Sequence, residues 1–242
     1  MTAPTRPPRL AGEGRYGKVV DAAAAMALFH DGAAMLFGGF GSIGTPPLLI
    51  DALLERGVRR LRIVGNDAGY PSHGVGRLIR AGQVEQAIVS HIGSNPIAIQ
   101  QMNDGLLDVT FVPQGTLAER IRAGGAGLGG ILTDVGEGTE VEEGKQVVEV
   151  DGRRYLLEPA LRAPLGIVLA DVGDEYGNLV YRGTARNFNP IVAMAADVVV
   201  AEVRTLVPAG ELDPDRIHTP GAFVDYIVPG SPVPGGIPAP KT

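Results

Sequence analysis

The sequence predicts an α/β fold: an open, mostly parallel sheet flanked by helices, with a small antiparallel β insertion around residues 133–160. Three observations predict it. Short apolar runs alternate with amphipathic segments along most of the chain, which is typical of a parallel sheet covered on both faces. The pattern changes near Thr133 to short alternating pieces between Gly turns. Finally, 242 residues that are 45% hydrophobic suffice for a full core, as one large domain or two small ones.

The first elements are marked by their ends. The Ala-rich stretch Val19–Phe29 predicts a helix that stops at the Asp31-Gly32 turn. Ala33–Phe37 then predicts a buried strand. Pro46-Pro47 suits only the first turn of a helix, and an apolar stripe follows until Gly57 ends it.

The alternation continues to the end of the domain. Thr116 and Glu119 predict a capping box at the start of one helix. We expect helices at 73–82, 95–105, 116–124 and 189–196, and strands at 61–67, 86–93, 107–115, 165–172 and 197–203. The segments 1–17 and 229–242 are expected to be a disordered arm and a mobile Pro/Gly-rich tail around one domain, 18–228.

Composition excludes several classes of protein. A net charge of -6 argues against a nucleic-acid partner, and no apolar run reaches the length of a membrane span. There are no cysteines, so disulfides and thiolate metal sites are excluded, and the four histidines lack metal-ligand spacing. No signal peptide is recognisable, so a cytoplasmic protein is expected.

A glycine-rich turn follows the first predicted strand. Gly39–Gly44 fits the G-x-G-x-x-G pattern of dinucleotide-binding folds, and Asp67 lies roughly where a ribose-binding carboxylate would sit. Against that interpretation, Pro46-Pro47 starts the helix too late, and Asp67 falls in a loop beyond its strand. The remaining alternatives are a simple tight turn and a different chemistry at the same loop.

The full stretch Asp31–Pro46 resembles the signature of family I CoA-transferases: an Asp-Gly turn, an apolar strand, Gly-Gly-Phe and then Gly-x-Pro. Four further stretches agree with it, and together they resemble the α subunit of the 3-oxoacid, acetate/butyrate–acetoacetate type over about 19–228. These stretches are Ser90–Pro96, Val112–Gly130, Glu142–Lys145 and Gly177–Pro190.

The resemblance implies a chemistry and a partner. In this family a glutamate attacks the acyl-CoA thioester, a glutamyl-CoA thioester forms, and an acceptor acid reverses the steps. That glutamate lies in a Ser-Glu-Asn-Gly motif of the β region, and this chain has no Glu followed by Asn-Gly. We therefore expect a separate β subunit, an α2β2 assembly, a CoA thioester as substrate, and no metal or permanently bound cofactor.

Candidate site residues fall into two groups. Backbone N–H groups of the glycine turn and the amide of Gln114, which follows a strand end, are expected to support the oxyanion and the substrate. The alternatives are a packing turn and a loop amide bonding local backbone. The oxyanion group is Gly38, Gly39, Phe40, Gly41 and Gln114, and the expected CoA-binding group is Gly44, Gly124, Gly125, Ala126, Gly127 and Asn187.

Other polar residues are expected to be structural. An Asn N-cap before Pro190 is the expected role of Asn189. Charges at Glu142, Glu143 and Lys145 are expected to face solvent on a hairpin, and His91 is the one histidine near the predicted site.

Three other functions compete with the first. A 3-oxoadipate or succinyl-CoA:3-oxoacid CoA-transferase would use the same site with a different acid pocket. A ligand-binding protein without catalysis would use a related sheet, and an NAD-dependent oxidoreductase would use the G-x-G-x-x-G turn. The sequence does not choose the acyl chain, because pockets distinguish methylenes by only about 1–3 kcal/mol.

Overall fold

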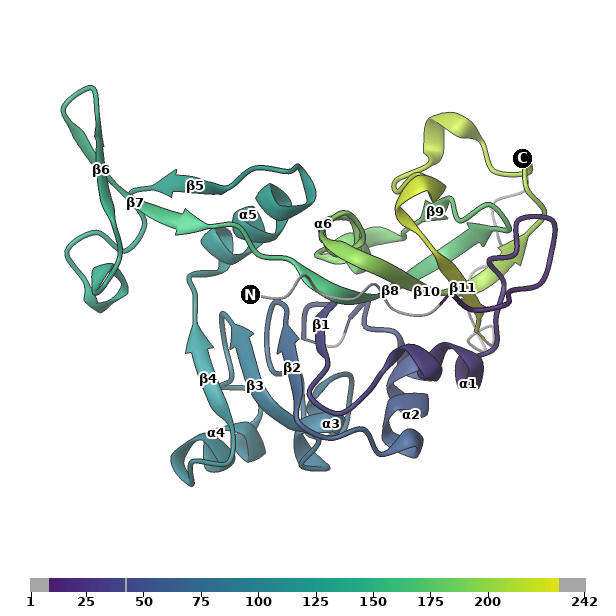
Figure 1. Ribbon diagram of the computed structural model, residues 1–242, viewed down its shortest axis with the longest axis horizontal. Helices are drawn as coiled ribbons and strands as arrows, with labels where there is room; N and C mark the ends of the chain where they lie inside the picture. The colour runs from purple at the N-terminus through teal and green to yellow at the C-terminus, as the bar shows by residue number, and fades with distance from the viewer. Residues whose placement is uncertain (1–8, 42, 231–242) are drawn as a thin grey trace.

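Seven parallel strands form the main sheet of the computed structural model, which describes residues 9–41 and 43–230 (Figure 1). The strand order is β11-β10-β8-β1-β2-β3-β4, and the short β9 pairs antiparallel with β8. The predicted open, mostly parallel sheet is confirmed. The strands are β1 Ala34–Phe37, β2 Leu61–Val64, β3 Val84–Val89, β4 Asp108–Phe111, β8 Ala163–Asp174, β9 Leu179–Val180, β10 Ala196–Val207 and β11 Tyr226–Pro229.

Two helical layers cover the two faces of this sheet. On β1 the side chains alternate: Met35 and Phe37 join the core under α1–α4, and Leu36 joins the core under α5 and α6. Burial on both faces explains why the strands are continuously apolar. The helices are α1 Ala22–Ala25, α2 Pro47–Arg56, α3 Gly76–Arg80, α4 Pro96–Asn103, α5 Gln114–Gly125 and α6 Asn189–Ala195.

Two helix starts differ from the prediction. The first helix is shorter than 19–29: Asp21 caps α1, and the chain continues as a 3-10 turn over Met26–Leu28. The predicted capping box is wrong, because α5 begins at Gln114 after Pro113, whose carbonyl accepts the first helical bond from Leu117. Thr116 therefore lies inside the helix, and its buried hydroxyl has no partner among the described residues.

The predicted antiparallel insertion is confirmed, and it projects from the main sheet (Figure 1). It contains β5 Gly130–Thr133, β6 Val147–Val150 and β7 Arg153–Pro159, with a two-residue Asp151-Gly152 turn whose φ angles are both positive. Lys145 does not simply face solvent as expected. Its ammonium pairs with Glu158, a 1% exposed carboxylate that also lies 3.3 Å from Arg120 of α5.

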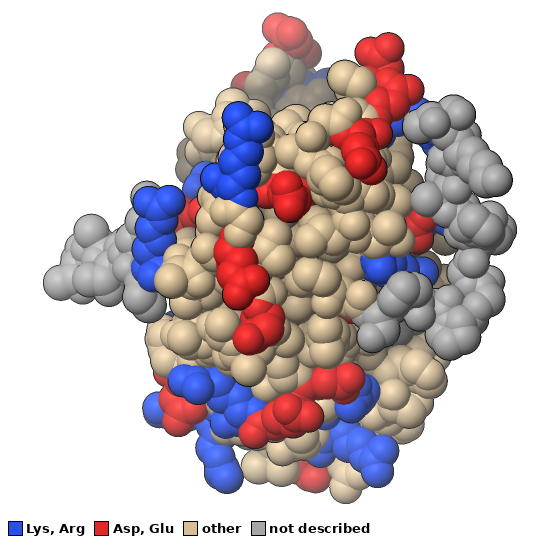
Figure 2. Space-filling view, turned by 90° about the vertical axis from the view of Figure 1, so that its right-hand side faces the viewer, with Lys and Arg blue, Asp and Glu red and all other residues tan. Residues whose placement is uncertain are grey.

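The predicted arm and tail are only partly described. Residues 9–17 contact the body: the Leu10 N–H donates to the Tyr226 hydroxyl at 2.8 Å, and Glu13 pairs with Val19. The expected disorder is thus wrong for this part of the arm, while 1–8 and 231–242 lie outside the described residues. Figure 2 shows acidic and basic side chains interspersed on one face of the molecule.

Candidate active site at the carboxyl ends of the strands

The predicted glycine turn lies where β1 ends, between the neighbouring strands β2 and β8. We call Gly38–Gly44 the glycine loop. Its first four N–H groups all donate within the chain: Gly38 to Ile167 O (2.9 Å), Gly39 to Asn187 Oδ1 (3.1 Å), Phe40 to Ile43 O (3.0 Å) and Gly41 to Asp67 Oδ2 (2.7 Å). The loop is therefore a braced structure, and any bond from these N–H groups to a substrate must displace a partner.

Glycine is required at several loop positions. Gly39 and Gly41 have φ angles of 128° and 55°, which L side chains rarely adopt. A Cβ on Gly39 would collide with the Thr45 side chain, and one on Gly38 would collide with Asn189. Close packing and backbone geometry thus both exclude larger residues here.

Two asparagines at the start of α6 hold the loop: Asn187 lies two residues before the helix, and Asn189 is its first residue. Asn187 accepts from Gly39 and donates to Ile43 O at 2.8 Å. Asn189 is fully buried and donates to Gly44 O at 3.0 Å, while its Oδ1 accepts from Leu169 N of β8. The N-cap prediction for Asn189 is wrong, because Phe188 occupies that position and the Asn189 side chain joins the loop to the sheet.

Asp67 braces the loop from the other side. Its carboxylate is 5% exposed and accepts from Gly41 N (2.7 Å), Gly69 N (2.7 Å) and Asn66 Nδ2 (2.6 Å). As expected, Asp67 follows the end of β2 in a loop. A carboxylate with these three donors is committed to the protein, which argues against the ribose-binding role.

Gln114 joins the same network. Its Nε2 donates to Asn66 Oδ1 at 3.0 Å, so side chains connect the start of α5 to the glycine loop through Asn66 and Asp67. The second N–H and the Oε1 of Gln114 have no partner among the described residues, and the side chain is exposed. The structure thus links Gln114 to the loop through Asn66 and Asp67, and leaves one of its amide N–H groups available.

An apolar rim surrounds this network. Phe40, Ile43 and Tyr70 are 51%, 57% and 46% exposed, and a Cβ on Gly41 would lie 3.7 Å from the Tyr70 ring. Exposed large apolar groups next to a polar network are typical of a surface that binds a ligand or a protein.

The second predicted glycine group lies elsewhere. Gly124 and Gly125 are at the far end of α5, and a helix of this length spans about 18 Å. A Cβ on Gly124 would meet the Leu161 carbonyl, and one on Gly125 would lie 2.6 Å from the Met194 Cβ of α6. Close packing within the chain accounts for these two glycines. Ala126 is the C-cap of α5, and Gly127 follows with a φ angle of 73° and open space around it.

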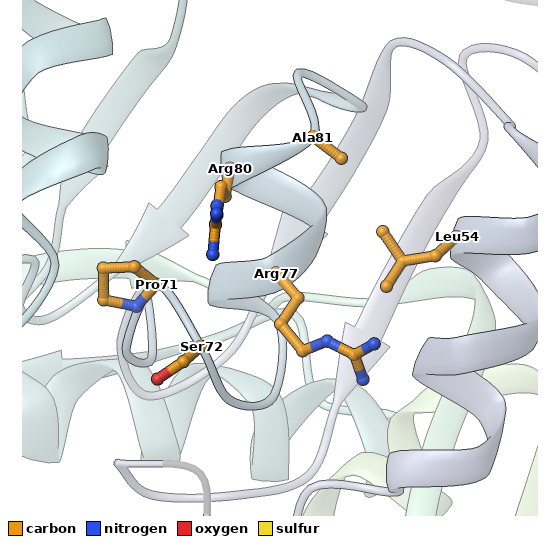
Figure 3. Close-up of a pocket in the computed structure, with 6 residues that line it drawn as sticks. All are labelled: Leu54, Pro71, Ser72, Arg77, Arg80 and Ala81. Carbon is orange, nitrogen blue, oxygen red and sulfur yellow. The ribbon is translucent and has the colours of Figure 1, made fainter.

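A cavity of about 360 Å³ lies between the segment at Pro71-Ser72 and the helices α2 and α3 (Figure 3). Pro71 and Ser72 line it on one side, and Arg77 and Arg80 of α3 on another. It contains none of the predicted site residues. His91 follows β3 with an exposed side chain, and none of the hydrogen bonds bracing the glycine loop comes from its ring.

Two further findings concern the described residues as a group. Within 9–41 and 43–230, no three His, Asp or Glu side chains are arranged to hold a metal ion. In the same ranges, no helix is both long and apolar enough to cross a membrane.

Comparison with known proteins decides the family. The model of the coenzyme A transferase family matches residues 19–230. This chain belongs to the coenzyme A transferase family. The resemblance to α subunits of family I that the glycine turn and four other stretches indicate is confirmed.

Two relatives of this family match almost their whole length. The probable coenzyme A transferase subunit alpha of Bacillus subtilis (strain 168) is 52% identical over 214 residues, 88% of this chain and 93% of that protein. The acetate CoA-transferase subunit alpha of Escherichia coli (strain K12) is 52% identical over 204 residues, 84% of this chain and 93% of that protein.

A solved structure shows the same fold at lower identity. An acyl-CoA transferase from Escherichia coli O157:H7, in a thioester complex with CoA, superposes with a TM-score of 0.78 at 24% identity. The match covers 93% of this CoA-transferase chain and 49% of the other.

Proposed function

We propose that this chain is the α subunit of a heteromeric CoA-transferase that moves CoA between a short-chain acyl-CoA and a free carboxylate. Acetoacetyl-CoA, butyryl-CoA and acetyl-CoA are the proposed thioesters. The nucleophilic glutamate comes from a separate β subunit. The observation that carries the proposal is the hydrogen-bonded glycine loop, which Asn66 and Asp67 link to the available donor of Gln114. Among the described residues, the carboxylate in this network is Asp67, and its hydrogen bonds to the protein occupy it.

The available donor gives Gln114 its proposed role. Attack on a thioester or an anhydride places negative charge on the former carbonyl oxygen, and a donor aimed at that oxygen lowers the barrier. One N–H already bonds Asn66, which restricts the amide and leaves the second N–H as the available donor. Loop N–H groups contribute donors in this proposal only where substrate displaces Asn187 or Asp67.

The apolar rim favours a monocarboxylic acyl chain. Phe40, Ile43 and Tyr70 offer carbon surface beside the proposed reaction centre. A succinyl or 3-oxoadipyl chain would place a second carboxylate against this surface and lose hydration. We therefore rank transfer to acetate or butyrate above transfer involving dicarboxylic acids. Turnover with succinate exceeding turnover with acetate would reverse this ranking.

The β subunit is supported by two observations. The relatives named above are subunits called alpha, and the solved transferase carries about half of its chain outside the matched part. The proposal includes an α2β2 assembly in the cytoplasm without a resident cofactor. Native mass spectrometry of the co-expressed subunits measures the stoichiometry.

Separate and combined chains test the function. We expect no transfer of CoA from acetoacetyl-CoA to acetate by the purified chain, and full transfer after its β chain is added. Borohydride with acyl-CoA should label the β chain alone, because it reduces the glutamyl thioester. The matched control is a β chain with Gln in place of the motif glutamate. Turnover by the isolated chain contradicts the proposal.

A further inference from the structure

Glu202 is a buried acid in the middle of β10. Its side chain is 3% exposed, between β8 and β11, where Leu169 and Val228 are its neighbours in register. Most carboxylates that are so deeply buried are paired with a cation or with several donors. No ion pair to Glu202 occurs in the described part of the chain. Its burial must therefore be explained by its hydrogen bonds.

Those bonds go to the start of α2. Pro46 and Pro47 have no N–H, so the first turn of α2 has two free donors, Leu48 and Leu49. Both donate to Oε2 of Glu202, at 2.9 and 3.1 Å. One carboxylate oxygen therefore satisfies the whole amino end of this helix, where a negative charge is also favoured by the helix dipole.

The start of α2 also follows directly after the carboxyl end of the glycine loop. Thr45 directly precedes the two prolines, and its side chain packs against Gly39, where no Cβ would fit. Asn189, which holds Gly44, accepts from Leu169, the register partner of Glu202. The carboxyl end of the loop and the start of α2 are thus fixed to adjacent positions of the sheet by Asn189 and Glu202.

We infer that Glu202 is a positioning residue of the transfer reaction: its carboxylate holds the start of α2, and through Thr45 it sets the glycine loop beside Gln114. It does not touch substrate in this role. Glu202 belongs neither to the glycine loop nor to the strand-end position that Gln114 occupies.

The environment of Glu202 makes its hydrogen bonds to Leu48 and Leu49 sensitive to pH. Burial raises the pKa of the Glu202 carboxyl to about 7, against the lowering by the Leu49 and Leu48 N–H groups. The charged groups that face it are Asp51 from α2 and Arg204 from its own strand. Arg204 lies 4.0 Å from Asp171 of β8, and on β11 the titratable group is Tyr226, whose hydroxyl accepts from Leu10.

The sign of the stability effect follows from this shift. A carboxyl with a pKa raised above its unfolded value of 4.5 holds its proton more tightly when folded. The folded state therefore loses stability as the pH rises from 4.5 towards 7. Glu202→Gln removes this cost, so the variant should unfold at a temperature no lower than the wild type at neutral pH. A lower unfolding temperature overturns the inference.

The absence of tryptophan allows the loop to be observed directly. Phe40→Trp gives the full chain a single tryptophan, on the glycine loop. We expect its fluorescence to change with a midpoint near pH 7, and this step to be absent when Glu202→Gln is added. All four histidines are present in both proteins, so the difference between the two curves reports Glu202. The same step in both proteins overturns the inference, and this readout does not depend on any enzymatic activity.

Kinetics of the complex with the β chain supply the second readout, which rests on the proposed function. We expect Glu202→Gln to lower kcat about tenfold, with KM for both substrates within about twofold, because misplaced catalytic groups lose rate more than binding. The acid limb of the kcat profile near pH 7 should disappear. Glu55→Gln, on the exposed side of α2, is the matched control for lost charge. Unchanged kcat and an unchanged pH profile in Glu202→Gln overturn the inference.

Discussion

Two glycine-rich segments of this CoA-transferase look alike in sequence and differ in structure. In the glycine loop, side chains from the end of β2 and from the start of α6 bond the backbone donors and acceptors. In the run 124–127, Gly124 and Gly125 serve only the close approach of α5 to its neighbours. Glycine marks a close approach in both places, and only the polar side chains around it indicate a site.

The largest effect is expected from Gly39→Val. A branched side chain at a φ angle of 128° strains the backbone and displaces Thr45, so the loop moves away from Gln114. Displacements of about 1 Å cost on the order of a hundredfold in rate. We expect loss of more than that in kcat with the α and β chains still assembled, as size-exclusion chromatography checks. Activity within tenfold of the wild type would make the loop purely structural.

Gln114 ranks second. Gln114→Ala removes the side-chain donor that the bond to Asn66 leaves available, and a lost oxyanion donor costs about 2.7 kcal/mol, on the order of a hundredfold in kcat. KM should change less. Gln114→Glu should be worse, because a negative charge would face carboxylate substrates. A rise in KM alone reassigns the residue to substrate binding, and unchanged kinetics in both variants removes it from the site.

The sequence predicted the helical and sheet layers of this fold well, and the long-range hydrogen bonds that hold the glycine loop poorly. Buried strands and amphipathic helices leave local patterns, and these gave the parallel sheet and the insertion. The start of α5 was misplaced because the Thr116–Glu119 pattern is weaker than the start set by Pro113. The roles of the site residues stay a prediction; the structure links Gln114 to the glycine loop through Asn66 and Asp67.

The hydrogen bonds that hold the glycine loop could not be predicted, because the two residues of each bond are distant in the chain. Asn189 bonds Gly44, 145 residues away, and Glu202 bonds Leu48, 154 residues away. In DVVVAEV, Glu202 has the pattern of an outward-facing strand residue. For Asp67 the sequence suggests only a ribose-binding carboxylate, although an acid directly after a buried strand is also the signal for a residue at the strand-end site.

A third prediction tests the packing segment. Gly125→Val places side-chain atoms against Met194 of α6, and overpacking of this kind costs about 1–3 kcal/mol. We expect a lower unfolding temperature, with kcat and KM of the remaining folded complex within about twofold of the wild type. The CoA-binding role first predicted for this segment would instead raise KM for acyl-CoA, which steady-state kinetics detects.

The smallest effect, and the sharpest comparison, comes from the pair Gly127→Ala and Gly41→Ala. Both glycines have positive φ, 73° and 55°, and neither has an atom closer than 3.7 Å to an added Cβ. The backbone cost should therefore be similar, about 1 kcal/mol in each chemical-denaturation curve.

Gly127→Ala should leave kcat unchanged, since the hydrogen bonds of that turn go to α5 and not to the glycine loop. Gly41→Ala should lower it, because its N–H is held by Asp67 and any shift disturbs the link to Gln114. Equal stability losses with unequal kcat would assign the difference to the site. Equal kcat values would mean that the two glycine segments differ in packing alone.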